Sequence, residues 1–182
     1  MSIYQKCIPG AYATSIFEIS YDQLKKQGIK SLFFDLDNTI IGYDENRLSE
    51  KHIQFFKELQ KDFNLLIMSN SGYERVSFAL QDLSCDYLWH SLKPTKIGFK
   101  KALKKVNTKK EETILIGDQL MTDVFGANRF GIQTILIHPV KRKSDRWMTR
   151  INRMIESHMI KKIKKHQPKI YQERLAQYVE GK

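Results

Sequence analysis

Two carboxylates, Asp35 and Asp37, follow the apolar run at residues 32–34. In an extended backbone, residues i and i+2 point the same way and lie roughly 6–7 Å apart, so both carboxylates would lean over one point. Two like charges so placed repel unless a cation or a proton lies between them. A hard cation such as Mg²⁺ takes oxygen ligands, so the pair needs a third carboxylate from elsewhere in the chain.

A second apolar run, at residues 113–116, supplies that third carboxylate. It is followed by Gly117 and Asp118, and Asp123 comes five positions after Asp118. Open parallel sheets bind their ligands at the carboxyl ends of the strands. We therefore expect Asp118 to meet the first pair at one edge of a sheet.

Polar groups suited to an anion lie between these two acidic stretches. The apolar run at residues 65–68 ends in Ser69 and Asn70, and Lys93 precedes Pro94. Taken alone, acids and a lysine at strand ends are typical of solvated termini, and Ser-Asn is typical of a turn or a helix N-cap. The order and spacing of all these residues together favour a functional site.

These four elements resemble the motifs of the haloacid dehalogenase (HAD) superfamily of phosphohydrolases. DLDNT at residues 35–39 is similar to its first motif, Ser69 to its second, Lys93 to its third, and GDQLMTD at residues 117–123 to its fourth. A lone D-x-D-x-T is a weak signal, whereas four elements in order, three of them closing apolar runs, are specific.

The resemblance implies a Mg²⁺-dependent phosphatase. Asp35 would be the nucleophile that forms an aspartyl-phosphate, and Asp37 would protonate the leaving oxygen and then deprotonate the hydrolytic water. The metal would be held by the side chains of Asp35 and Asp118 and by the backbone carbonyl of Asp37. A carboxylate can attack a phosphate dianion only if cationic groups offset the repulsion, which agrees with this assignment.

The remaining motif residues would handle the phosphate. By the same resemblance, Lys93, Ser69 and Asn70 would hold the phosphoryl oxygens. Asp123 would orient Lys93 or a nearby water molecule.

The elements that position these residues predict an α/β fold. Apolar runs alternate with helical patterns, which is typical of a doubly wound, Rossmann-like parallel sheet. We expect five strands, ending near residues 36, 68, 90, 117 and 137, in the order 5-4-1-2-3 of the HAD arrangement. We expect residues 1–19 to be irregular and to cover the sheet.

The chain leaves no room for a cap domain. HAD enzymes that enclose small substrates insert one between the first and second motifs or between the second and third. Here those intervals are residues 36–68 and 70–92, and a crossover helix alone uses a dozen or more residues of each. An open site is expected, suited to a bulky substrate, to one displayed on a surface, or to a partner subunit acting as a lid.

The composition is that of a globular protein without a disulfide framework. Its 182 residues fit one domain with an extension, and Cys7 and Cys85 form neither a disulfide framework nor a zinc motif. A reducing cytoplasm is the simplest expectation. No apolar run is long enough for a membrane span, and residues 1–10 lack the apolar core of a signal peptide.

Most of the net charge lies in the last quarter of the sequence. Residues 141–182 contain 13 Lys and Arg against 4 acids, whereas residues 1–140 contain 18 against 16. We therefore divide the chain into a capless HAD domain, 1–140, and a basic helical tail, 141–182.

An amphipathic helix is predicted over residues 144–165 of this tail. A cationic helix with Trp and Met on its apolar face suits an anionic membrane surface. The alternative is that its apolar stripe packs on the sheet or on a second copy of the helix.

The capless architecture and the basic tail narrow the resemblance to the YqeG-like branch of HAD subclass III. That branch is similar to mitochondrial phosphatases acting on phosphatidylglycerophosphate, which suggests this anionic phospholipid as substrate at the inner membrane face. Two alternatives are a phosphatase of a soluble metabolite or phosphoprotein, and a nucleic-acid-binding or ribosome-associated factor using the tail. The tail has few interleaved aromatic residues, which disfavours single-strand binding.

Overall fold

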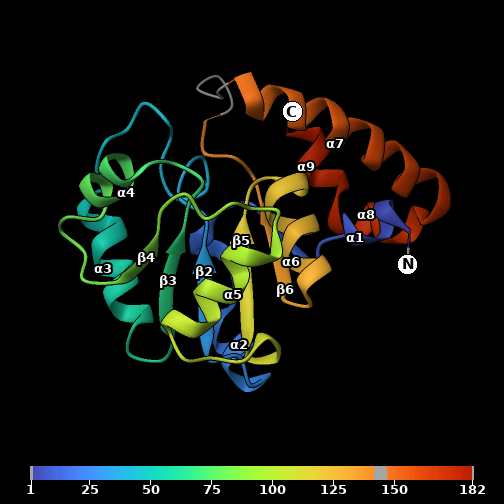
Figure 1. Ribbon diagram of the computed structural model, residues 1–182. Helices are drawn as coiled ribbons and strands as arrows, with labels where there is room; N and C mark the ends of the chain where they lie inside the picture. The colour runs from blue at the N-terminus through green and yellow to red at the C-terminus, as the bar shows by residue number, and fades with distance from the viewer. Residues whose placement is uncertain (1, 142–146, 182) are drawn as a thin grey trace.

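The computed structural model describes residues 2–141 and 147–181 and shows an α/β fold built on one parallel sheet (Figure 1). The sheet has six strands in the order β1-β6-β5-β2-β3-β4. The five predicted strands are the last five of this series, in the predicted order. Their bounds are β2 Ser31–Phe34, β3 Asn64–Met68, β4 Asp86–Leu88, β5 Thr113–Gly117 and β6 Gln133–Ile137.

The sixth strand, β1 (Ala11–Ala13), corrects the expectation that residues 1–19 are irregular. It pairs in parallel with β6, with Ala11 opposite Ile135. The same region contains a short helix, α1 (Ile3–Lys6), and a 3-10 turn, η1 (Ile16–Glu18). A strand of three residues is too short to show an alternating pattern, so the sequence did not reveal it.

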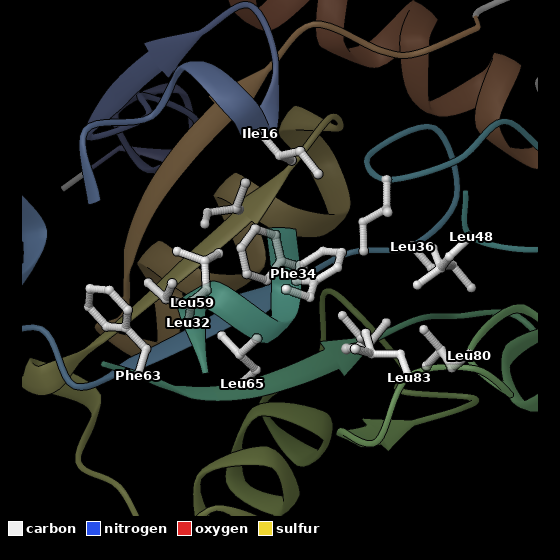
Figure 2. Close-up of a cluster of buried hydrophobic side chains, with 14 of the residues drawn as sticks. Ile16, Leu32, Phe34, Leu36, Leu48, Leu59, Phe63, Leu65, Leu80 and Leu83 are labelled. Carbon is white, nitrogen blue, oxygen red and sulfur yellow. The ribbon is translucent and has the colours of Figure 1, made fainter. Parts of the chain in front are cut away.

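One face of the sheet packs against α2 (Tyr21–Lys26), α3 (Glu50–Leu59) and α4 (Tyr73–Ala79). Alternate strand residues point to this face, as expected for extended chain. Figure 2 shows Leu32 and Phe34 of β2 in one cluster with Leu59 of α3. The Ser49 hydroxyl accepts a hydrogen bond from the backbone N–H of His52 and caps α3, as its position before the helix predicts.

The opposite face packs against α5 (Lys96–Lys105) and α6 (Phe125–Phe130). Phe33 and Leu115, from the alternate strand positions, meet Phe99 of α5 and Ala127 of α6. A 3-10 turn, η2 (Lys110–Glu112), precedes β5, and one π-helical turn, η3 (Leu120–Val124), precedes α6. The helical segment that follows Asp118 therefore begins with a wider turn.

The C-terminal tail forms α7 (Trp147–His166), α8 (Pro168–Arg174) and α9 (Ala176–Glu180). α7 packs against α1 and η3, so the C-terminal tail lies beside the N-terminal helix (Figure 1). Ile160 and Ile163 of α7 are buried in a cluster with Cys7, Leu120 and Leu136. One hydrophobic cluster therefore crosses the predicted boundary at residue 140.

In the part of the chain that the structure describes, no cap domain covers the carboxyl edge of the sheet. Residues 36–92, all within the described part of the chain, contain only connecting loops, α3, β3, α4 and β4. Among the helices in residues 2–141 and 147–181, none combines the length and hydropathy needed to cross a membrane.

Candidate active site

The predicted site residues converge at the carboxyl ends of the central strands. Asp35 and Asp37 follow β2, and Asp118 follows β5, its neighbour in the sheet. The two strands pair with Phe34 opposite Ile116, and the Asp35 N–H donates to the Ile116 carbonyl at 2.9 Å. This register brings acids that are distant in sequence to one point.

Three buried carboxylates form the centre of the site. Asp35, Asp118 and Asp123 each offer an oxygen, and these three atoms lie within 4.8 Å of one another. The Thr39 hydroxyl lies 3.1 Å from Asp35 Oδ2 and 3.4 Å from Asp118 Oδ1. A Cβ at Gly117 would lie 2.5 Å from the Asp123 carboxylate, so this close approach requires a glycine.

This donor set fits a hard divalent cation. The three oxygens are anionic, close together and withdrawn from solvent, which is the environment in which Mg²⁺ takes carboxylate ligands. The Asp37 side chain lies outside the cluster. The resemblance implied only its backbone carbonyl as a ligand. Asp123, predicted to orient Lys93, is also close enough to be a ligand.

Lys93 lies between two of the acids. Its Nζ is 2.6 Å from Asp35 Oδ1 and 2.8 Å from Asp123 Oδ1, and the residue is 5% exposed. α6 supports the loop at Pro94, where a Cβ on Gly126 would lie 2.9 Å from the Pro94 Cα. A buried ammonium at this position is suited to holding an anionic oxygen beside the Asp35 carboxylate.

Asn70 braces the lysine loop. Its side-chain amide donates to the Lys93 carbonyl at 2.9 Å, and its oxygen accepts from the Lys93 N–H at 2.9 Å and from the Ser91 hydroxyl at 2.9 Å. The amide predicted to contact phosphate is thus engaged with the backbone that carries Lys93.

The Asp37 carboxylate is held by a polar network. Its Oδ2 accepts from the hydroxyl of Ser71 at 2.6 Å and from that of Ser69 at 3.2 Å, while its Oδ1 accepts from Arg75 Nε at 3.0 Å. Arg75 also donates to the carbonyl of Gly42 at 3.0 Å and to that of Glu45. The sequence reasoning missed Ser71 and Arg75. The place of Ser71 two positions after Ser69 was an available signal, whereas no local pattern indicated Arg75.

The tail supplies a second contact that the sequence reasoning missed. Arg153 on α7 places its guanidinium 2.6 Å from Asp118 Oδ2 and 3.1 Å from the Asp118 carbonyl. The Tyr178 hydroxyl of α9 lies 2.7 Å from Arg153, 3.0 Å from the Asp118 carbonyl and 2.7 Å from Glu156. Glu156 in turn accepts from the Leu120 N–H at 3.2 Å, so the tail is bonded to the fourth motif through both charge and backbone.

Burial dominates the electrostatics of the cluster. It raises the pKa of Asp35 well above its usual range, against the opposing charge of Lys93 and with the help of the neighbouring acids. It also raises the pKa of Asp118 to about 7, although Arg153 opposes the shift. The pKa of Lys93 is raised because the charges of Asp123 and Asp35 outweigh the effect of its own burial. Burial and the neighbouring acids thus disfavour the charged forms of Asp35 and Asp118, and a bound cation would offset both effects.

Comparison with known proteins agrees with this geometry. Residues 1–81 match the family described as mitochondrial PGP phosphatase, and residues 92–150 match the HAD-hydrolase-like family. The probable phosphatase YqeG of Bacillus subtilis is 34% identical over 159 residues, which cover 87% of this chain and 92% of that protein. Phosphatidylglycerophosphate phosphatase 1 of Arabidopsis thaliana, chloroplastic and mitochondrial, is 23% identical over 87% of this chain and 48% of its own length.

Solved structures support the fold. NagD from Escherichia coli K-12 superposes with a TM-score of 0.51 at 12% identity, covering 68% of this chain and 91% of NagD. At that identity the likeness concerns the fold alone, and the YqeG match over nearly its whole length carries the family assignment. The chain belongs to the YqeG-like, PGP-phosphatase-like branch of the HAD superfamily, a branch of phosphoric monoester hydrolases.

Proposed function

We propose that this chain is a Mg²⁺-dependent phosphomonoesterase that works through an aspartyl-phosphate on Asp35 and dephosphorylates phosphatidylglycerophosphate. The observation that carries the chemistry is the convergence of three buried carboxylates with Lys93, whose Nζ lies 2.6 Å from Asp35. Such a site brings a nucleophile, a cation and a place for a metal to one phosphoryl group.

In the first step, an oxygen of Asp35 attacks phosphorus and the bond from phosphorus to the leaving oxygen breaks. The leaving oxygen takes its proton from the carboxyl group of Asp37. Lys93 and the Ser69 hydroxyl offset the charge on the phosphoryl oxygens. Thr39, at 3.1 Å from Asp35, helps to fix the nucleophile.

In the second step, water attacks the phosphorus of the aspartyl-phosphate. The Asp37 carboxylate takes a proton from this water, which restores its acid form. The bond from phosphorus to Asp35 breaks, releasing inorganic phosphate and the free carboxylate. Ser71 and Arg75 keep the Asp37 side chain in place between the two steps.

Asp35, Asp118 and Asp123 would hold the Mg²⁺ ion together with the Asp37 carbonyl. When bound, the ion supplies positive charge that reduces the repulsion between the Asp35 carboxylate and the phosphate dianion. Arg153 remains as the partner of the second Asp118 oxygen.

Two features favour a lipid substrate. The family match over residues 1–81 is to PGP phosphatases, and the uncapped site can accept a headgroup displayed on a surface. The 144–165 helix is one candidate for the surface that contacts the membrane. Its side chains at 144–151 lie outside the described part, and Met154 and Ile155 are exposed.

The chemistry is tested with Asp35→Asn. Mg²⁺-dependent release of phosphate from a chromogenic ester should fall by several orders of magnitude, because an amide is not a nucleophile. Asp22→Asn, at an exposed position on α2, is the matched control and should retain full activity. Unchanged hydrolysis by Asp35→Asn would refute the mechanism.

The substrate is tested separately, with phosphatidylglycerophosphate in detergent micelles. We expect turnover of this lipid to exceed that of soluble sugar phosphates and phosphopeptides. A protein that hydrolyses small esters and ignores the lipid would be a phosphatase of a soluble substrate. Binding to RNA that falls steeply with salt and survives Asp35→Asn would favour the nucleic-acid alternative.

A further inference from the structure

The outer side of α5 is a strip of exposed residues at helical spacing. Ile97, Lys100, Lys101 and Lys104 occupy positions i, i+3, i+4 and i+7, and all four are exposed. Phe99, on the opposite side, is fully buried against the sheet. We call these four residues the α5 face. They project away from the fold along one line, as residues at this spacing do.

Large apolar side chains gather at the active-site end of this face. Trp89, Leu92 and Ile97 are 47%, 51% and 54% exposed. With Lys101 they line one groove, and the Tyr73 ring packs edge-on against Trp89 at 5.9 Å. Single exposed apolar residues are ordinary on protein surfaces, but a contiguous group with a charged border marks an interaction site.

This groove is directly connected to the catalytic site. Leu92 immediately precedes Lys93, whose ammonium contacts Asp35 at 2.6 Å inside the fold. The same loop therefore carries one side chain into the site and the adjacent one out to solvent. A surface that touches Leu92 lies at the entrance to the uncapped site.

The surrounding chain is cationic without interruption. Residues 89–110 contain eight lysines and no acidic residue. Lys105 pairs with Asp86 at 3.1 Å, whereas the three lysines of the α5 face point outward. An anionic surface would be complementary to this strip.

We propose that the α5 face and its groove bind an anionic lipid bilayer and present the open catalytic site to it. This inference rests on the proposed lipid phosphatase function and adds the surface by which the enzyme meets its substrate. Leu92 and Ile97 would enter the acyl boundary, and Tyr73 and Trp89 would lie at headgroup level, where amphipathic rings are favoured. The aliphatic residues favour a bilayer over a nucleic acid, which would engage aromatic rings and lysines only.

The charge contribution is tested with two triple variants that change net charge equally. One is Lys100→Gln, Lys101→Gln, Lys104→Gln. Its matched control is Lys161→Gln, Lys162→Gln, Lys165→Gln on the exposed side of α7, which also tests α7 as the competing membrane surface. Binding is measured to vesicles of phosphatidylglycerol and phosphatidylcholine, neither of which is a substrate. Each lysine near an anionic surface contributes about fivefold, so the first variant should lose up to about 100-fold in binding at low salt. The control should lose much less.

The apolar contribution is tested with Ile97→Gln, which keeps the helix and removes the aliphatic contact. At high salt, where charge is screened, this variant should bind vesicles more weakly than the unchanged protein does. Hydrolysis of a small soluble ester should be unchanged in all three variants, because none of these residues contacts the site.

Two measurements separate the two proposals: vesicle binding, and turnover of phosphatidylglycerophosphate in micelles. The α5 surface would be overturned if both triple variants lost vesicle binding equally, if only the α7 variant lost it, or if neither did. This holds even if lipid turnover in micelles is intact. If phosphatidylglycerophosphate is not turned over in micelles, the proposed substrate fails, whatever the vesicles show. A face that binds RNA and not phosphatidylglycerol vesicles would also overturn the bilayer proposal.

Discussion

The basic helices α5 and α7 look alike in sequence and differ in what they do with their apolar residues. In α7, Ile160 and Ile163 are buried in the cluster behind β6, and Arg153 reaches Asp118. In α5, Phe99 and Ala102 face the sheet while Ile97 remains exposed beside the groove. Helical spacing thus indicates which residues share a side of a helix, but the neighbouring elements decide what that side meets.

The net charge summed over residues 1–140 concealed the basic character of α5 and the residues around it. Residues 1–140 are nearly balanced, with 18 basic and 16 acidic residues, yet residues 89–110 have eight lysines and no acid. Acids elsewhere in the first 140 residues offset these lysines in the sum. Charge acts over about 10 Å at ordinary ionic strength, so a local window is the relevant measure.

The largest contrast between the helices should be in stability. Ile163→Ala removes a fully buried side chain and should lower the free energy of unfolding by about 2–5 kcal/mol. Ile97→Ala, at an exposed position, should change it by less than about 0.5 kcal/mol. Urea denaturation followed by circular dichroism measures both. Similar losses in the two variants would mean that the α5 face is packed against something.

The next contrast concerns the site. Arg153→Ala removes the partner of Asp118 and should lower phosphatase activity by about 10–100-fold, because contacts behind a metal ligand set its orientation. The Mg²⁺ concentration for half-maximal activity should rise, and Arg153→Lys should restore part of the loss.

Arg174→Ala is the control for Arg153→Ala, since Arg174 on α8 donates to the Pro9 carbonyl at 3.0 Å, away from the acids. It should leave the Mg²⁺ dependence unchanged. Higher activity of Arg153→Ala at limiting Mg²⁺ would contradict the positioning role and identify Arg153 as a competitor of the metal.

The smallest effect should be spectroscopic. The chain has two tryptophans, Trp89 beside α5 and Trp147 on α7. With Trp147→Phe, the remaining Trp89 should shift its emission to the blue on anionic vesicles. With Trp89→Phe, Trp147 reports on the helix for which the sequence predicted membrane contact. A shift from Trp147 alone would favour α7 over α5 as the membrane surface.

The central sheet and the acidic cluster were predictable because their signals are local. Apolar runs of three or four residues, followed by Asp35, by Ser69 and by Gly117 with Asp118, identify strands and the edge at which they end. Asp123 was named through the resemblance of residues 117–123 to the fourth HAD motif, as a partner of Lys93 and not as a metal ligand.

Other parts of the site depend on contacts that no local pattern encodes. Arg75 reaches Asp37 across 38 positions, and Arg153 reaches Asp118 across 35. β1 is three residues long, and its pairing with β6 depends on an edge that other elements create. The spacing of apolar residues does not indicate which distant residue or strand will become a partner, because tertiary packing decides that.

The order of synthesis gives one of these contacts a further meaning. The Tyr178 hydroxyl donates to the Asp118 carbonyl across 60 positions of the chain. While a ribosome is still translating this message, the nucleophile and the acids are already made, but the helices that fix Asp118 have not emerged. The contacts around Asp118 are therefore made in two stages: Tyr178 can join them only after 60 further residues have been added to the growing chain.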